Sequence, residues 1–578
     1  MVTRRDLLKM GILGTSGLVL LPAGGGFGRL LSKGSGAQRS PVLEPFVDPL
    51  PNTAFLTEQT SLPDITPYAR PFVGATTRFF EISTEERFVK FHRDLPPTPV
   101  WAYVDPHAAA VEPARLISFA FKHVTLGQPE GGGILIRHHN NLTTAPRDFG
   151  FPTLSPHFHG GHQPAAADGF PHNLVNRPAD FPATVTIEPG HSYDYVHPLR
   201  DVGFNEPEGP TSDERSCILW FHDHILDFTG QNVYRGLANV VPVFDEIDTE
   251  NEADPSPRAL RLPSGAFDLT LVLQDKTFDH GGTLIFDPFN QDGFLGDTPA
   301  VNGVVQPFHE TKRRKHIFRL LNGGNARIYE LVLSNDLGQT FPMTLVATEG
   351  GLLSRPLPGV GSITLAMAER AAVVVDFADP IFSGQQVIYL ENRMAQTNGR
   401  KPDGVIAQGV KLLKFILTDR VADPSRVGIP DPITGELVLR PFAKVTPSEI
   451  AAAEMHSFTF DRSHGVFTIN GKPVDIEHPV ATIRRNTPQI WHLENKSGGW
   501  WHPIHIHSEF MRVLRRNGKQ PPLNERDGVA RKDTILLRGG ENVDVFLKFR
   551  DYSGPFVFHC HNIEHEDMAM MARFDIVD

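Results

Sequence analysis

Four histidine pairs, each with a single residue between its members, constrain most strongly how this chain can fold. They lie in the segments HFHGG, WFHDH, HPIHIH and HCH, and their members are His157 and His159, His222 and His224, His505 and His507, and His559 and His561. Residues two apart on a β-strand point to the same face, so each pair can present two imidazoles to one side. The pairs therefore predict strands that together supply eight nitrogen ligands.

The segment FHCHNIEHEDMAMM, residues 558–571, predicts a second centre beside the first. Cys560 lies between two histidines and must face the opposite way on a strand. His565 and Met570 follow Cys560. Pro503 shifts His502 out of the alternation that places His505 and His507 on one face of a strand. Two imidazoles, a thiolate and a weak thioether are the ligands of a blue-copper (type 1) site, whereas structural zinc prefers four strong ligands. The eight paired histidines can hold three more coppers, so the sequence predicts four copper ions and a covalent link between two centres through Cys560.

The pattern along the rest of the chain is typical of an all-β protein. Short alternating runs such as RLISFAFKHVTLG, FDLTLVLQDKTF, RAAVVVDF, HSFTFDRSHGVFTING and NVDVFLKF predict strands. The best helical segment is TPSEIAAAEMHS, which Thr446 could cap. A formal net charge of -12 argues against nucleic acid as the main partner.

Two stretches rich in acidic residues or proline, 245–258 and 419–441, predict connections between domains. They divide the chain of 578 residues into three parts, each long enough for a Greek-key β-sandwich. We therefore expect domains at 39–246, 247–420 and 449–578, with a linker at 421–448 and an export signal at 1–38.

The N-terminal segment MVTRRDLLKMGILGTSGLVLLPAGG resembles a twin-arginine export signal, with Arg4 and Arg5 before a weakly apolar run. The alternative, a membrane anchor, is disfavoured because glycines interrupt the run and it is shorter than the roughly 20 apolar residues that a spanning helix needs. We expect export by the twin-arginine machinery, a cleavage point between about residues 23 and 40, no stable membrane anchor, and a periplasmic or secreted protein. We expect Cys217, the only other cysteine, to be a small buried residue without a functional role.

At these motifs the chain resembles the multicopper oxidases, the three-domain laccase-like family. The segments LWFHDHILDFTGQNVYRGLANV, RLLNGGNARIYEL and FLGDTPAVNG are similar to the branch of bacterial spore-coat laccases, bilirubin oxidases and phenoxazinone synthases. The resemblance implies three cupredoxin-like domains, with the type 1 copper in the last and a trinuclear cluster between the first and the last. It implies these ligands: His502, Cys560, His565 and Met570 for type 1; His157 and His505 for type 2; His159, His222 and His561 for one type 3 copper; and His224, His507 and His559 for the other.

The resemblance also implies that Asp168 and Glu566 supply protons, although the residues alone favour a solvated loop and a turn carboxylate. The cluster MAMM leaves Met568 and Met571 as alternative axial ligands, and spacing favours Met570. Trp500 and Trp501 could line the rim where a reductant meets the type 1 site, or simply pack.

The activity implied is the one-electron oxidation of phenols or aromatic amines coupled to the four-electron reduction of O2 to water. Alternatives are oxidation of Cu(I), Mn(II) or bilirubin, a non-enzymatic exported cupredoxin-fold protein, and a relative of the two-domain nitrite reductases. His107, His162, His172 and His492 lie near the motifs but outside the strand alternation, so we expect them not to be ligands.

Overall fold

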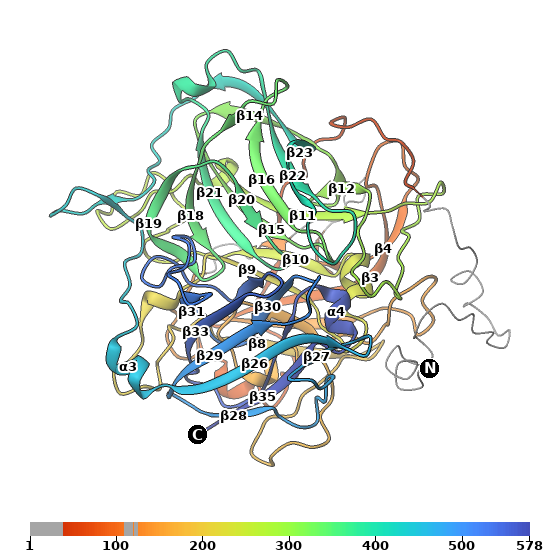
Figure 1. The fold of residues 1–578 in the computed structure, drawn as a ribbon, viewed down its shortest axis with the longest axis vertical. Coiled ribbons are helices and arrows are strands. Elements are labelled where there is room, and N and C mark those ends of the chain that lie inside the picture. Colours follow the sequence, from red (N-terminus) through yellow and green to blue (C-terminus); the bar gives the residue numbers. More distant parts are fainter. Residues whose placement is uncertain (1–38, 109–118, 121–124) are drawn as a thin grey trace.

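The computed structural model describes residues 39–108, 119–120 and 125–578 of the chain. These residues form three β-sheet domains with few helices, which confirms the all-β prediction (Figure 1). The middle domain forms the upper lobe of Figure 1, and in the lower lobe the last domain lies in front of the first. The predicted export signal and most of the predicted strand RLISFAFKHVTLG lie outside the described residues.

The first domain pairs a five-stranded sheet, in which β4 lies beside the path β2-β3-β6-β8, with the three-stranded sheet β10-β9-β7 and the short pair β1-β5. Its elements are β1 Ala54–Phe55, β2 Glu58–Gln59, the 3-10 helix Arg70–Phe72, β3 Arg78–Val89, β4 Thr98–Val104, β5 Phe119–Ala120, β6 Ile134–Asn140, β7 Pro156–His159, the 3-10 helix Ala165–Ala167, β8 Ser192–His197, the 3-10 helix Ser212–Glu214, β9 Ile218–Asp223, α2 Thr229–Arg235 and β10 Ala238–Pro242.

The middle domain is a sandwich of a seven-stranded sheet, β13-β12-β11-β15-β21-β18-β19, and a six-stranded sheet, β14-β23-β22-β16-β17 with β20 beside β16. Its elements are the 3-10 helix Gly265–Phe267, β11 Asp268–Lys276, β12 Thr298–Val301, β13 Val304–Val305, β14 Phe308–Arg313, β15 Lys315–Asn322, β16 Tyr329–Ser334, β17 Thr340–Phe341, β18 Met343–Thr348, β19 Gly351–Val360, β20 Ile363–Leu365, β21 Arg370–Asp376, the 3-10 helix Pro380–Phe382, β22 Val387–Ala395 and β23 Gly404–Arg420.

The last domain consists of two five-stranded sheets, β27-β26-β29-β33-β31 and β28-β35-β34-β30-β32. Its elements are β26 Glu454–Ser463, β27 Val466–Ile469, β28 Ala481–Arg484, β29 Pro488–Asn495, β30 His502–Ile506, β31 Arg512–Arg516, β32 Thr534–Leu537, β33 Asn542–Lys548, β34 Gly554–Cys560, α4 Ile563–Asp567 and β35 Met571–Val577. The segment before it carries a two-stranded pair, β24 Ile429–Pro430 and β25 Leu437–Val438, and the helix α3, Pro447–Ala452.

The three domains share one topological feature. A strand near the start of each domain pairs in parallel with a strand that is not its neighbour in sequence: β3 with β6, β11 with β15, and β26 with β29. Parallel pairing requires the chain to cross over between the two strands. All three domains therefore have a crossover connection of this kind near their start.

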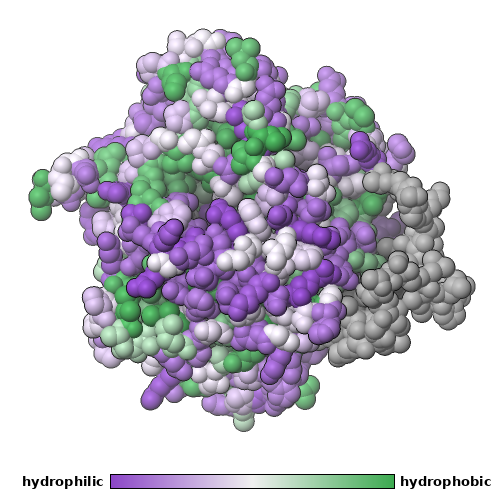
Figure 2. Space-filling model, in the orientation of Figure 1, coloured by the Kyte–Doolittle hydropathy of each residue, from purple (hydrophilic) through white to green (hydrophobic). Residues whose placement is uncertain are grey.

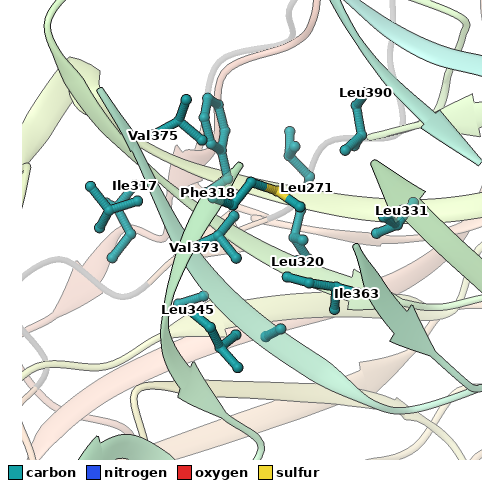
Figure 3. Close-up of a cluster of buried hydrophobic side chains, with 14 of the residues drawn as sticks. Leu271, Ile317, Phe318, Leu320, Leu331, Leu345, Ile363, Val373, Val375 and Leu390 are labelled. Carbon is teal, nitrogen blue, oxygen red and sulfur yellow. The ribbon is translucent and has the colours of Figure 1, made fainter. Parts of the chain in front are cut away.

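Local sequence explains several of these elements. Thr446 caps α3 and forms a capping box with Glu449, which confirms the predicted helix. The segment RAAVVVDF becomes the central strand β21, and Val373 on it packs with Leu320 of β15 and Leu331 of β16 in the middle domain's core (Figure 3). Burying each such side chain contributes roughly 1.5–3 kcal/mol, so this core stabilises the domain independently of any metal.

The predicted domain boundaries stay predictions, although the strands of each domain fall inside them. β10 ends at Pro242, β11 to β23 span Asp268 to Arg420, and β26 begins at Glu454. The core of the middle domain also includes Ile218 and Trp220 of β9, so the first and middle domains share an apolar interface. No helix in the described part of the chain is long and apolar enough to span a bilayer.

Candidate metal centre

The four histidine pairs lie on four strands that meet where the first and last domains pack together. β7 carries His157 and His159, and β9 carries His222 and ends directly before His224. These two strands pair with His157 opposite His222. β30 carries His505 and ends directly before His507, and β34 carries His559 and ends directly before His561. These two strands pair with His505 opposite His559. In the first domain and in the last domain, antiparallel pairing therefore places one histidine pair beside the other.

The rings of the two domains interleave. His159 stacks on His505 with 3.7 Å between ring centroids, and His157 stacks on His507 at 3.9 Å. None of the eight paired histidines is more than 1% exposed. Three groups made up only of these histidines have potential ligand atoms within 4.8 Å of one another, and they are His157, His505 and His507; His157, His159 and His222; and His224, His507 and His559.

His561 completes this set. The centroid of its ring lies 5.2 Å from that of His222 and 5.3 Å from that of His159. All eight paired histidines therefore gather in one buried cluster, hereafter the histidine cluster.

The outer nitrogens of this cluster face fixed oxygen acceptors. His507 Nδ1 lies 2.7 Å from Asp168 Oδ2, and His559 Nδ1 lies 3.0 Å from Glu566 Oε2. Beside ionised Glu566, Nδ1 of His559 carries the proton, since an ionised carboxylate only accepts and a neutral imidazole has one donor and one acceptor. The proton in the His507–Asp168 contact lies on Nδ1 when Asp168 is ionised and on Oδ2 when Asp168 is protonated. Carboxylates that orient imidazoles in this way are typical of metal sites.

The inner nitrogens are left facing each other. His559 Nε2 lies 3.2 Å from His224 Nε2 and 3.3 Å from His507 Nε2, so lone pairs converge on one point. Among the described residues, buried ring nitrogens of six cluster members find no hydrogen-bond partner, and these belong to His157, His159, His222, His224, His505 and His561. Buried nitrogens without partners are costly, and metal ions placed among them would satisfy them.

Burial also keeps these imidazoles neutral. It lowers the pKa of His222 to about 3 and that of His224 to about 4. A metal ligand must be deprotonated at its binding nitrogen, so the cluster is ready to bind metal without losing protons at neutral pH. Burial raises the pKa of Asp168 well above its ordinary value, which favours a carboxyl group that holds a proton.

Cys560 faces a separate group on the other side of β34. Its Sγ lies 3.3 Å from His502 Nδ1 and 3.6 Å from His565 Nδ1, and the two nitrogens are 3.1 Å apart. The main chain of Met570 bonds to both Cys560 and His565, and its buried side chain shares their core. One soft thiolate with two imidazoles fits copper better than a structural zinc ion.

A helix and a carboxylate position this thiolate group against the first domain. α4 carries His565 and Glu566, and Asp567 at its end accepts hydrogen bonds from the backbone of Thr229 and Gly230 at 2.9 Å each. On the inner side, Ser497 Oγ lies 2.7 Å from His502 Nε2 and fixes that ring.

Asp533 contacts the histidine cluster and Arg370 binds Asp533, and the sequence did not reveal either of them. The Asp533 carbonyl accepts from His505 Nδ1 at 2.8 Å, and its Oδ1 accepts from His159 Nε2 at 3.2 Å. Arg370 of the middle domain binds both carboxylate oxygens at 2.7 Å. One buried ion pair thus joins all three domains at the histidine cluster.

The four histidines that we expected not to be ligands lie outside these groups. His107 contacts Glu81, His162 contacts Asp551 and His492 contacts Asp544. His172 is exposed. Cys217 is buried directly before β9, as expected.

Comparisons with known proteins identify the family. The family model described as multicopper oxidase matches residues 443–578. A laccase of Haloferax volcanii is 30% identical in an alignment that covers 93% of this chain and 86% of the relative. The chain belongs to the multicopper oxidase family. It is a laccase-like copper oxidoreductase that uses O2.

Other multicopper oxidases agree with this assignment. A laccase of Bacillus stratosphericus is 29% identical over 93% of this chain and 99% of its own length. A bilirubin oxidase of Albifimbria verrucaria is 30% identical over 78% of this chain and 70% of its own. The crystal structure of a multicopper oxidase from Aquifex aeolicus matches with a TM-score of 0.68 and 24% identity over 93% of this chain and all of that one, which supports the three cupredoxin-like domains.

Proposed function

We propose that the histidine cluster and the Cys560 group hold four coppers and that the protein couples one-electron oxidations to the reduction of O2 to water. The converging unpartnered nitrogens of the histidine cluster carry this proposal, because bound metal ions would satisfy them. When bound, the four coppers supply four one-electron couples, which match the four electrons that O2 takes up.

The ligands would be distributed as follows. His502, Cys560, His565 and Met570 would hold the type 1 copper; His157 and His505 the type 2 copper; His159, His222 and His561 one type 3 copper; and His224, His507 and His559 the other. The buried thiolate group at Cys560 supports the first set, and the groups of ring nitrogens within 4.8 Å support most members of the others.

The chain's own atoms provide the connection between the sites. Cys560 is bonded through single peptide links to His559 and His561, so a short covalent path leads from its Sγ into the histidine cluster. Asp168 Oδ2 and Glu566 Oε2 lie against cluster imidazoles, where they would hold and pass protons. Four phenols and one O2 give four phenoxyl radicals and two waters, so four protons move with the four electrons.

Phenols and aromatic amines are the reductants that we propose, in keeping with the laccases among the relatives. Bilirubin is a second candidate because one relative is a bilirubin oxidase. A dedicated Cu(I) oxidase is less favoured, since the chain has ten methionines and no methionine-rich insertion, and Mn(II) stays a further candidate.

Copper analysis and an oxygen electrode test the proposal. The copper-reconstituted protein is expected to hold four coppers per chain, to be intensely blue, and to consume one O2 for every four phenols oxidised without releasing peroxide. A colourless protein with a single copper, or release of one peroxide for every two phenols, would refute it. Parallel assays with bilirubin, Mn(II) and Cu(I) rank the alternative reductants.

We also propose that the twin-arginine machinery exports the chain to the periplasm or beyond. Arg4 and Arg5 before a weakly apolar run support this. Replacing both with lysine is expected to leave the protein in the cytoplasm on cell fractionation. Unchanged export of that variant would contradict the proposal.

A further inference from the structure

A short series of aromatic rings leads from the Cys560 group to the surface. The ring of His565 packs on buried Phe467 with 4.0 Å between centroids, and Phe467 meets half-buried Trp500 edge to face at 6.0 Å. His565 Nδ1 faces Cys560, so the rest of its ring is turned toward these aromatic side chains. Trp500 is therefore the outermost ring on this side of the Cys560 group.

Arginine side chains crowd this tryptophan. The guanidinium carbon of Arg462 lies 4.6 Å from the Trp500 ring centroid, and that of Arg400 lies 4.9 Å from it. Arg538 lies 5.4 Å from the ring of the next residue, Trp501. Guanidinium groups within about 6 Å of an aromatic face are held by the ring's negative potential.

These arginines differ in whether a carboxylate neutralises their charge. Asp292 forms an ion pair with Arg400 at 2.9 Å and accepts a hydrogen bond from Trp500 Nε1 at 3.2 Å. Arg462 donates to the neutral amide of Gln291 at 2.5 Å. Within the described part of the chain, Arg462 has no carboxylate within ion-pair distance, and its buried Nε has no hydrogen-bond partner. A local positive charge thus remains beside Trp500 on a chain whose formal net charge is -12.

A cavity between the middle and last domains has, among its described lining residues, no basic residue left without a carboxylate partner. It has a volume of about 860 Å³, and it lies near β18 and β19, where hydrophobic residues gather in Figure 2. Its basic residues are paired with carboxylates: Lys532 with Glu349, for example, and Arg516 with Glu525. The cavity therefore presents no unmatched cation comparable to Arg462.

We propose that Trp500, Arg462 and Arg400 form a docking site for aromatic reductants that carry a carboxylate or sulfonate. The anionic group would pair with Arg462, while the aromatic ring approaches Trp500 and through it the His565 side of the Cys560 group. A charge-assisted hydrogen bond to a partly buried guanidinium is stronger than one to a fully exposed group. The site thus selects anionic over neutral phenols. This inference rests on the proposed oxidation of small reductants at the Cys560 group.

Steady-state kinetics with two matched phenols test the site. Syringate, 4-hydroxy-3,5-dimethoxybenzoate, differs from 2,6-dimethoxyphenol only by its carboxylate. In the Arg462→Gln variant, KM for syringate is expected to rise about three- to tenfold more than KM for 2,6-dimethoxyphenol. Comparing each substrate between variant and parent cancels the difference in their intrinsic ease of oxidation.

A control variant separates docking from overall charge. Arg484→Gln removes one positive charge from an exposed position on β28 and is expected to change neither KM. Equal changes in KM for both phenols in Arg462→Gln, or equal effects of the two variants on syringate, would overturn the proposed site.

Direct binding gives a readout that does not need turnover. 3,4,5-Trimethoxybenzoate keeps the ring and the carboxylate but lacks the oxidisable hydroxyl, and 3,4,5-trimethoxybenzamide is its neutral counterpart. Three of the five tryptophans, Trp101, Trp220 and Trp491, are at most 1% exposed, so a change of emission on binding reports mainly on Trp500 and Trp501. The parent enzyme is expected to bind the benzoate more tightly than the amide, and Arg462→Gln is expected to remove this preference.

These outcomes distinguish the site from the proposed function. If the parent binds the benzoate preferentially but oxidises neither phenol, the oxidase proposal fails and the docking site stands. If it oxidises both phenols with equal KM and binds benzoate and amide alike, the docking site is wrong and the oxidase proposal stands.

Discussion

Replacing Cys560 with serine is expected to remove the intense blue colour and to lower phenol oxidation by at least about 100-fold, because changes even to residues that only support metal ligands cost 10- to 100-fold. Cys560 Sγ is the thiol donor beside His502 and His565, and a serine hydroxyl is a hard donor that does not ionise near neutral pH. The variant should lose one copper per chain and keep the coppers of the histidine cluster. Visible absorption, copper analysis and oxygen uptake measure these effects.

Cys217 offers a matched control. It is the only other cysteine, is equally buried, and lies at the edge of the middle domain's core. Cys217→Ser is expected to keep four coppers and the blue colour, with only a loss of stability. A Cys560→Ser protein that oxidised every reductant as fast as the parent would show that electrons bypass this residue.

Replacing Arg370 with glutamine is expected to deplete copper from the histidine cluster and leave the blue colour. The change leaves the Asp533 carboxylate buried without its cation, and breaking a buried ion pair costs about 3–5 kcal/mol. Asp533 would lose the contact that holds its carboxylate in place, and the hydrogen bonds that orient His159 and His505 would weaken with it. The expected protein is blue but holds fewer than four coppers and consumes O2 at least about tenfold more slowly.

Arg319 provides the control for this prediction. It is as deeply buried in the middle domain and binds Asp268 at 2.8 Å and Asp248 at 3.2 Å, away from the histidine cluster. Arg319→Gln is expected to lower the melting temperature by a similar amount and to retain four coppers. If both variants lose copper equally, Arg370 acts only through stability and does not position the ligands.

The same contact accounts for a glycine in the motif HFHGG. Gly160 has φ +82°, and a Cβ there would lie 2.5 Å from Arg370 Nη2. Both the backbone conformation and the guanidinium therefore exclude a larger residue directly after His159.

The parts of the site that could be predicted from the sequence depend on local periodicity. Residues two apart share a face of a strand, so the pair His157 and His159 and the opposed Cys560 can be identified without knowledge of the fold. The β-patterning of segments such as RAAVVVDF likewise predicted strands, because burial on a sheet selects apolar β-branched residues. The resemblance then supplied the distribution of ligands among the coppers, which periodicity alone does not give.

The remaining features depend on contacts between residues far apart in the chain. Asp533 meets His159 and Arg370 only because three domains pack together, and the segment RKDT resembles an exposed charged turn in sequence although its side chains are buried. Arg462, likewise, is an ordinary strand residue until the fold brings it over Trp500. Long-range packing of this kind leaves no periodic signal in the sequence.

The Cys560 group comes from one domain, whereas the histidine cluster needs more than one. This difference implies that the two centres form in a fixed order as the protein folds. The proposed type 1 ligands His502, Cys560, His565 and Met570 all belong to the last domain, so these side chains come together as soon as that domain has folded. The histidine cluster exists only after the first and last domains have docked, with the Arg370 and Asp533 pair holding the middle domain against both. The proposed oxygen-reducing centre therefore depends on the docking of domains, whereas the proposed type 1 site does not.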